Sequence, residues 1–157
     1  MNNQQNTIDL LIKTCEGIRL TAYPDEGGIW TIGIGLARTY LDGTPIKKGD
    51  TCTEKEAYTW LNEYLEKNVY PAVNALCNGH NVPPEIFESL CCFAYNEGNT
   101  PFLHPQFEKS IQDNNWNDLA NIMLLYNKVR KKGELVFSPG LNKRRLIEIN
   151  HFRSFLC

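Results

Sequence analysis

The stretch that decides the fold runs from Glu16 to Gly35 and reads EGIRLTAYPDEGGIWTIGIG. Short runs of β-forming residues stand on either side of a Gly-rich turn, which predicts two antiparallel strands joined by a hairpin. Asp25 falls in the turn and Thr31 in the second strand, while Glu16 precedes both strands. Two carboxyls held apart across a cleft can hydrolyse a sugar linkage, one by protonating the leaving oxygen and the other by activating water. This stretch is therefore the candidate catalytic region.

A helix is expected immediately before this region, with Glu16 in its last turn. Apolar residues recur at the spacing of one helix face, Asn6 or Thr7 can cap the start, and Gly17 is suited to end it. The negative end of the helix dipole and the flanking apolar stripe both favour the neutral form of a carboxyl at this position. Glu16 is therefore expected to act as a general acid, whereas Asp25, at a polar turn, is expected to be ionised.

Thr31 is expected to face open space. On an extended strand it shares one face with Gly33 and Gly35. Glycines on that face would let a ligand or another backbone approach closely.

The remainder of the chain is predominantly helical in its pattern. Residues 53–56 form a capping box that opens a long helix, predicted to continue to about Val69 or beyond. Further helices are predicted over residues 83–95, 105–113, 115–126 and about 140–155. The fold class is α+β in one domain, 1–157. A small antiparallel sheet lobe, about 16–53, is joined by the long helix to a larger helical lobe, about 54–157 plus the N-terminal helix, with the active site in the cleft between them.

Composition and charge narrow the class of protein. The chain has 157 residues, of which 42% are hydrophobic and 22% charged. A chain of this size can bury a core without disulfides, so the six irregularly spaced cysteines are expected to be mostly free thiols.

The net charge of −2 argues against nucleic-acid binding, although half of the 16 basic residues lie in the last thirty positions and can steer a polyanion. Neither a signal peptide nor a membrane-spanning stretch is recognisable, so a cytoplasmic protein without stable membrane insertion is expected.

Three motifs in order along the chain resemble the phage-type lysozymes, the endolysins of glycoside hydrolase family 24. The first is the spacing Glu-x8-Asp-x5-Thr within residues 16–35. The second is FAYNEG at 93–98, similar to the family's aromatic-Asn-x-Gly stretch, and the third is PGLNKRRLIE at 139–148, similar to its Gly-Leu-x-x-Arg-Arg-x-x-Glu signature. The resemblance implies a lysozyme-like fold and cleavage of the β-1,4 bond between N-acetylmuramic acid and N-acetylglucosamine in peptidoglycan, during lysis of a bacterial host.

Catalytic roles follow from the resemblance together with the local chemistry. Glu16 would be the general acid, while Asp25 and Thr31 would hold and activate the attacking water. This division predicts inversion at the anomeric carbon, which requires carboxyls roughly 6.5–9.5 Å apart, whereas about 5–5.5 Å would indicate retention. The inverting prediction rests on the resemblance, because spacing along the sequence does not measure that gap.

Other residues have supporting roles in this hypothesis. Tyr95 and Asn96 would offer a stacking face and an amide to N-acetyl sugars, with Ser110 a weaker candidate. Arg144 or Arg145 could reach Glu16 from the last helix and orient it. No cofactor or metal is expected. The resemblance further implies a monomer that acts on the cell wall after a holin releases it from the host cytoplasm.

Three alternatives stay open from the sequence. A lytic transglycosylase would use one acid and no bound water. A non-catalytic carbohydrate-binding or toxin-delivery module would keep Tyr95 and Asn96 without needing the three catalytic candidates. Cys77, His80 and the adjacent Cys91 and Cys92 suggest zinc, but neighbouring cysteines on a helix point about 100° apart, which makes joint ligation awkward.

The chain also departs from the family pattern at Cys15, where an aromatic residue is usual, and at Tyr126, where Trp is common.

Overall fold

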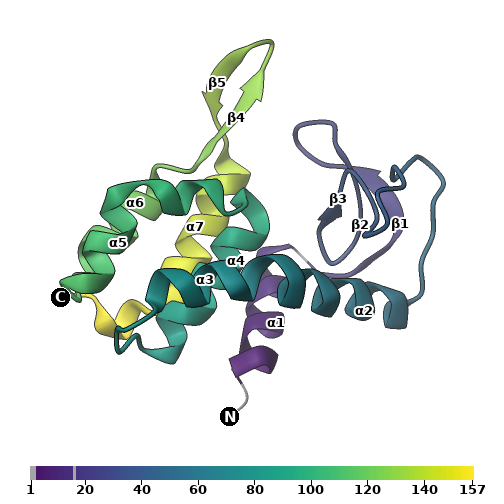
Figure 1. The fold of residues 1–157 in the computed structure, drawn as a ribbon. Coiled ribbons are helices and arrows are strands. Elements are labelled where there is room, and N and C mark those ends of the chain that lie inside the picture. Colours follow the sequence, from purple (N-terminus) through teal and green to yellow (C-terminus); the bar gives the residue numbers. More distant parts are fainter. Residues whose placement is uncertain (1–2, 16) are drawn as a thin grey trace.

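The computed structural model describes residues 3–15 and 17–157. A small three-stranded antiparallel sheet stands beside a larger group of helices, and one long helical rod runs beneath both (Figure 1). This arrangement confirms the predicted α+β class with a sheet lobe and a helical lobe. None of the helices in the described part of the chain combines the length and apolar character needed to cross a bilayer.

Helix α1, Asn3–Thr14, precedes the sheet in sequence but packs in the helical lobe. Its buried Ile8, Leu10 and Leu11 join the main core. The predicted start at Asn6 or Thr7 is wrong, because the helix begins three residues before Asn6 and Thr7 is buried inside it. Gly17 has a left-handed backbone with φ +101° and donates its N–H to the carbonyl of Ile12 at 2.8 Å, which is how it redirects the chain towards the sheet.

The sheet has the strand order β1-β2-β3, with β1 at Arg19–Pro24, β2 at Trp30–Gly33 and β3 at Leu36–Ala37. The sequence analysis treated Thr31, Gly33 and Gly35 as parts of one extended strand, but the structure breaks this segment into two strands. Gly33 and Gly35 have φ values of +68° and +70°, and these left-handed positions turn the chain back so that β3 pairs with β2. A second, smaller core lies under the sheet and consists of Ala22, Ile32, Leu36 and Ile46.

The long helical rod comprises α2, Glu54–Tyr64, a π turn over Leu65–Val69, and α3, Tyr70–Cys77. Its predicted capping box is present: Thr53 donates its N–H to a Glu56 carboxylate oxygen at 2.7 Å, and the Glu56 N–H donates to the Thr53 hydroxyl at 3.1 Å. Pro71 explains the π turn, because a proline ring would clash with the carbonyl four residues earlier in a regular helix. The rod therefore spans both lobes without interruption.

The helical lobe is built around α4, Pro84–Glu97, which packs against α1, α3 and α7. The other helices are α5, Pro105–Gln112, α6, Trp116–Leu124, and α7, Pro139–His151, with short 3₁₀ turns at Thr100–Leu103 and Arg153–Phe155.

All six cysteines are free thiols, as the sequence indicated, and four of them are buried. Burial raises the pKa of Cys91 and Cys92, so these thiols act as apolar core residues.

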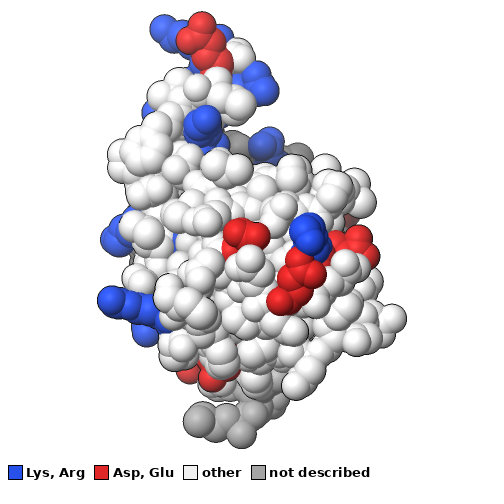
Figure 2. All heavy atoms as spheres, turned by 90° about the vertical axis from the view of Figure 1, so that its left-hand side faces the viewer, with Lys and Arg blue, Asp and Glu red and all other residues white. Residues whose placement is uncertain are grey.

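A hairpin that the sequence did not predict joins α6 to α7. It consists of β4, Lys128–Lys131, and β5, Glu134–Phe137, paired in register across a two-residue turn. Lys132 and Gly133 both have left-handed backbones, φ +49° and +85°, which match the right-handed twist of a tight hairpin. The hairpin projects from the helical lobe (Figure 1), and Figure 2 shows basic side chains gathered on it at the top of the molecule.

Candidate active site

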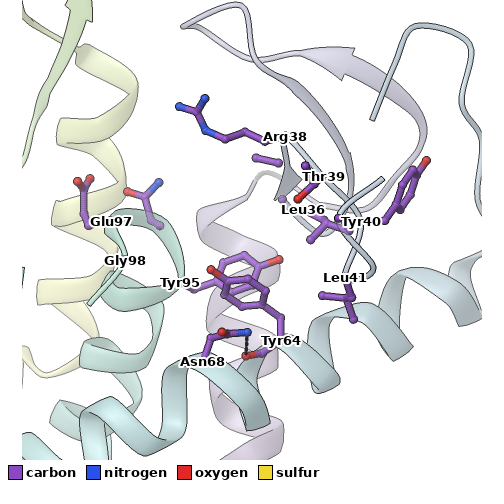
Figure 3. A pocket seen from close by; sticks show the side chains of 14 residues that line it. Leu36, Arg38, Thr39, Tyr40, Leu41, Tyr64, Asn68, Tyr95, Glu97 and Gly98 are labelled. Atoms are coloured by element: carbon purple, nitrogen blue, oxygen red, sulfur yellow. Dashed lines mark hydrogen bonds between the residues drawn. The ribbon is translucent and has the colours of Figure 1, made fainter. Parts of the chain in front are cut away.

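Two adjoining hollows lie between the lobes. The first hollow has a volume of 430 Å³ and is lined by Thr14, Cys15, Tyr23, Asp25, Glu26, Gly27, Ile29, Arg38, Asn96, Val129, Arg130, Gly140, Leu141 and Arg144. The second hollow has a volume of 630 Å³ and is lined by Gly35, Leu36, Ala37, Arg38, Thr39, Tyr40, Leu41, Gly43, Tyr64, Asn68, Tyr95, Asn96, Glu97 and Gly98 (Figure 3). Arg38 and Asn96 line both hollows, so the two form one groove across the molecule.

Asp25 lies in the first hollow and is fixed by its own turn. Its Oδ1 accepts the N–H groups of Gly27 and Ile29, each at 2.8 Å, while its backbone N–H donates to the carbonyl of Ile29 at 2.9 Å. Its other carboxylate oxygen has no hydrogen bond within the described part of the chain. The turn thus uses one oxygen for structure and leaves the second for chemistry, on a side chain that is exposed.

Thr31 is on β2, opposite Tyr23 on β1, but it does not face open space. Its exposed fraction is 4%, and its hydroxyl donates to the carbonyl of Ile29 at 3.1 Å. A Cβ added to Gly33 would lie 3.2 Å from the Cβ of Ala57, and one added to Gly35 would lie 2.7 Å from the Cys15 sulfur. The glycines therefore make room for protein atoms of α2 and of the residue after α1, and the expectation of an open surface beside Thr31 is wrong.

Glu16, the candidate acid, lies outside the described residues. Its sequence neighbour Cys15 lines the first hollow, and the Cys15 sulfur accepts a hydrogen bond from Arg144 Nη2 at 3.7 Å. Burial raises the pKa of Cys15, and the nearby guanidinium only partly opposes this, so the thiol is the expected form.

Arg144 and Arg145 have opposite environments. Arg144 lines the first hollow, whereas Arg145 is fully buried beneath it. Arg145 donates to the carboxylates of Glu97 at 3.1 Å and Glu148 at 2.9 Å, and to the Asn96 Oδ1 at 2.7 Å. Of the two arginines that the sequence proposed to orient the acid, only Arg144 borders the hollow.

Burial dominates the electrostatics of this buried cluster. It raises the pKa of Glu148 to about 7, although the Arg145 guanidinium opposes the shift. Burial likewise raises the pKa of Glu97, which Arg145 also opposes. One oxygen of Glu148 has no hydrogen-bond partner in the described structure, which is consistent with a carboxyl that readily holds a proton.

The predicted sugar-binding residues have separate positions. Tyr95 lines the second hollow, where its hydroxyl donates to the carbonyl of Ile34 at 2.7 Å and its ring meets Tyr64 edge to face at 5.2 Å (Figure 3). Asn96 borders both hollows. Ser110 is buried on α5, donates to the carbonyl of Gln106 at 2.7 Å and borders neither hollow.

Sequence reasoning missed a contact that closes one end of the first hollow. Glu26 accepts a hydrogen bond from the buried Ser138 hydroxyl at 2.5 Å and approaches Lys131 Nζ at 3.6 Å. Ser138 also caps α7, because its hydroxyl accepts the N–H of Leu141 at 3.1 Å. A Ser-Pro pair before a helix is typical of a cap, a signal that the sequence analysis did not use, but nothing in the local sequence indicates the partner 112 residues away.

Metal ligation has no support among the described residues, where no group of three or more His, Cys, Asp or Glu side chains converges. The groove presents carboxylates, guanidinium groups, amides and aromatic rings, a set suited to a polar, extended ligand.

Comparisons with known proteins place nearly the whole length of the chain beside phage enzymes. Residues 13–148 match the phage lysozyme family. The endolysin of Acyrthosiphon pisum secondary endosymbiont phage 1 is 28% identical over 148 residues, covering 92% of this chain and 94% of that protein. The endolysin of Salmonella phage P22 is 29% identical over 137 residues, covering 86% and 90%. The solved structure of the endolysin from Escherichia coli O157:H7 phage FAHEc1 superposes with a TM-score of 0.77 at 34% identity, covering 97% of this chain and 93% of that one.

Proposed function

Because the chain belongs to the phage lysozyme family, and is thus a peptidoglycan-hydrolysing glycosidase, we propose that it cleaves the β-1,4 bond between N-acetylmuramic acid and N-acetylglucosamine. The observation that carries the proposal is Asp25, which the turn holds in the first hollow with one carboxylate oxygen unbound. A fixed, ionised carboxylate at the wall of a groove is what activation of a water molecule requires.

In this proposal Glu16 is the general acid. It follows Cys15, which lines the same hollow as Asp25, and the sequence places it at a helix end, where the neutral acid is favoured. Arg144, which borders the hollow beside Cys15, would orient the acid.

Thr31 would fix the attacking water by accepting from it, which requires the water to reach a side chain that is 4% exposed and lines neither hollow. Its hydroxyl proton is already donated to the Ile29 carbonyl, so only its lone pairs are available to a water molecule. Asp25 would take the proton of that water, and the sugar would invert.

The second hollow would hold the glycan strand. Arg145 already donates to the Asn96 side-chain oxygen. The amide N–H groups of Asn96 therefore remain to donate to an acetamido carbonyl of the sugar. Tyr95 would supply an aromatic wall to the same strand.

The decisive test is digestion of purified peptidoglycan by the wild type and by Glu16→Gln, scored as new reducing ends. The variant should be slower by about 10²–10⁴-fold, the contribution of a general acid. Glu108→Gln, on an exposed position of α5, is the matched control and should retain full activity. Equal rates for wild type and Glu16→Gln would overturn the assignment.

The products separate the proposal from its nearest enzyme rival. Reducing ends, released first as the α-anomer and detected by NMR, support an inverting hydrolase. Anhydromuramic ends would instead establish a lytic transglycosylase. A complete absence of cleavage would favour a non-catalytic wall-binding module.

We further propose that the protein works as a monomer, without a nucleic-acid partner, and meets the wall after a holin releases it from the host cytoplasm. The family resemblance supports the release route, and the net charge of −2 supports the exclusion of nucleic acid. Sedimentation at working concentration tests the monomeric state. Lysis with and without a co-expressed holin tests the release route.

A further inference from the structure

Arg38, at the junction of the two hollows, has an unusual backbone. Its φ is +71°, in the left-handed region that glycine and asparagine adopt readily and that other residues rarely adopt. Two hydrogen bonds fix this conformation, because the Arg38 N–H donates to the Trp30 carbonyl at 2.9 Å and the Ile46 N–H donates to the Arg38 carbonyl at 2.9 Å. Backbone strain of this kind concentrates at functional sites.

The guanidinium of Arg38 has no ion pair or hydrogen bond among the described residues, and the side chain is exposed. Figure 3 shows it extending from the end of β3 towards the helical lobe, on the side where Glu97 lies. Glu97 does not pair with it within ion-pair distance, and one Glu97 oxygen accepts from the buried Arg145 at 3.1 Å. Arg38 therefore presents five N–H donors to the groove.

The remaining charges near Arg38 favour an anion as its ligand. The first hollow is lined by three arginines, Arg38, Arg130 and Arg144, against two carboxylates, Asp25 and Glu26. The Glu26 carboxylate is already engaged by Ser138 and Lys131. A guanidinium binds a carboxylate through two parallel hydrogen bonds, whereas a neutral sugar hydroxyl cannot offset its full charge.

We propose that Arg38 binds a free carboxylate of the peptide attached to the glycan strand. This inference rests on the proposed function: where each lactyl group of N-acetylmuramic acid is amide-bonded to a peptide, the glycan strand is uncharged, so the carboxylates of peptidoglycan lie on its peptides. Because Arg38 borders both hollows, the bound peptide belongs to a sugar close to the bond that is cleaved. The enzyme would then prefer glycan whose peptides carry free carboxylates to glycan whose peptide carboxyls are amidated.

The test measures binding of the disaccharide-peptide released from peptidoglycan, in its free-acid form and with its carboxyls converted to amides. Arg38→Gly is the informative variant, because glycine accepts the left-handed backbone and the side chain is lost without new strain. Calorimetry should show affinity for the free acid reduced by about tenfold or more, as expected when a charge-assisted hydrogen bond is removed. Affinity for the amidated form should not change.

Two further variants complete the design. Arg38→Lys should fall between wild type and Arg38→Gly, because an ammonium retains the charge without the paired donors. Arg153→Ala, which removes an exposed cation at the far end of the chain, should bind like the wild type. Equal losses for both forms of the ligand, or no loss for either, would overturn the role of Arg38.

Hydrolysis assays on the same variants separate this inference from the proposed function. Wild-type protein that releases no reducing ends refutes the function, while the binding comparison still decides the role of Arg38. If the function holds, Arg38→Gly should lose activity on peptide-bearing glycan with free peptide carboxyls and retain it on the same glycan with those carboxyls converted to amides. Equal loss on both substrates would contradict the inference.

Discussion

Two hairpins meet across the groove, and they are stabilised in different ways. The β1–β2 hairpin carries Asp25 at its turn, and that side chain bonds two N–H groups of the same turn. The β4–β5 hairpin turns through the left-handed pair Lys132 and Gly133, and all four residues of β5 are exposed. The first hairpin is held by its own side chain and a small core, whereas the second stands on the helical lobe with little packing of its own.

This difference assigns different tasks to the two hairpins. A reactive carboxylate needs a fixed position, and the Asp25 turn provides one within five residues of chain. The β4–β5 hairpin supplies Val129 and Arg130 to the wall of the first hollow, and its sparse packing means that it opens at a lower free energy than the core. Glu26 and Ser138 join the two hairpins at this point.

Removing the Asp25 carboxylate while keeping the turn of the first hairpin should have the largest effect on activity. Asp25→Asn retains an oxygen for the N–H groups of Gly27 and Ile29 but lacks a base, so the rate of peptidoglycan hydrolysis should fall by about 10²–10⁴-fold at nearly unchanged thermal stability. Asp42→Asn is the matched control, because Asp42 accepts the N–H of Thr44 at 2.9 Å in another turn and borders neither hollow. A comparable loss in the control, or full activity in Asp25→Asn, would contradict the role of Asp25.

The helical lobe, on which the second hairpin stands, should show a pH-dependent stability through Glu148 on α7. Burial raises the pKa of Glu148 to about 7 from the ordinary value of 4.5, so the folded state holds a proton that the unfolded state releases between these values. The stabilisation is complete below about pH 4.5 and is lost as the pH rises through about 7. Relative to Glu148→Gln, the free energy of unfolding should fall by on the order of 2 kcal/mol over this range.

Urea denaturation of both proteins at pH 5 and pH 7.5 measures that difference. The variant keeps an oxygen for Arg145, so the comparison isolates the titration of the carboxyl. Parallel pH dependence in the two proteins would mean that Glu148 is ionised throughout.

Separating the two hairpins should have a moderate effect. Ser138→Ala removes both the cap of α7 and the buried donor to Glu26, and it should lower the free energy of unfolding by about 1–2 kcal/mol. Glu26→Gln keeps an acceptor for Ser138 and loses only the exposed pair with Lys131, so it should cost less than about 0.5 kcal/mol. Equal losses in the two variants would show that the charge of Glu26, and not the hydrogen bond, joins the hairpins.

Loosening the second hairpin alone should have the smallest effect. Gly133→Ala places a side chain at φ +85° and should destabilise the hairpin by about 1 kcal/mol, seen as roughly fivefold faster amide hydrogen exchange over residues 128–137. Exchange in β1 and β2 should not change. Gly79→Ala, at φ +80° in the connection before α4, carries the same backbone penalty and should leave the hairpin unaffected.

The parts of the fold that were predictable are those set by neighbouring residues. The capping box at Thr53 and Glu56, the proline at the start of α4 and the Asp25 turn all depend on groups within a few positions of one another. The β4–β5 hairpin was missed because its strands are four residues long and β5 is exposed on both faces, so no alternation of apolar and polar residues marked them.

The same division holds within the candidate site. The sequence by itself determined that Asp25 occupies a polar turn and that Arg144 and Arg145 follow one another on a helix. Only the tertiary structure decided that Arg145 is buried with Glu97 and Glu148, that Gly33 and Gly35 fit against protein atoms, and that Arg38 borders both hollows. The physical reason is range: turns and caps are closed by hydrogen bonds between near neighbours, whereas the groove is formed by packing between segments that the chain separates by tens of residues.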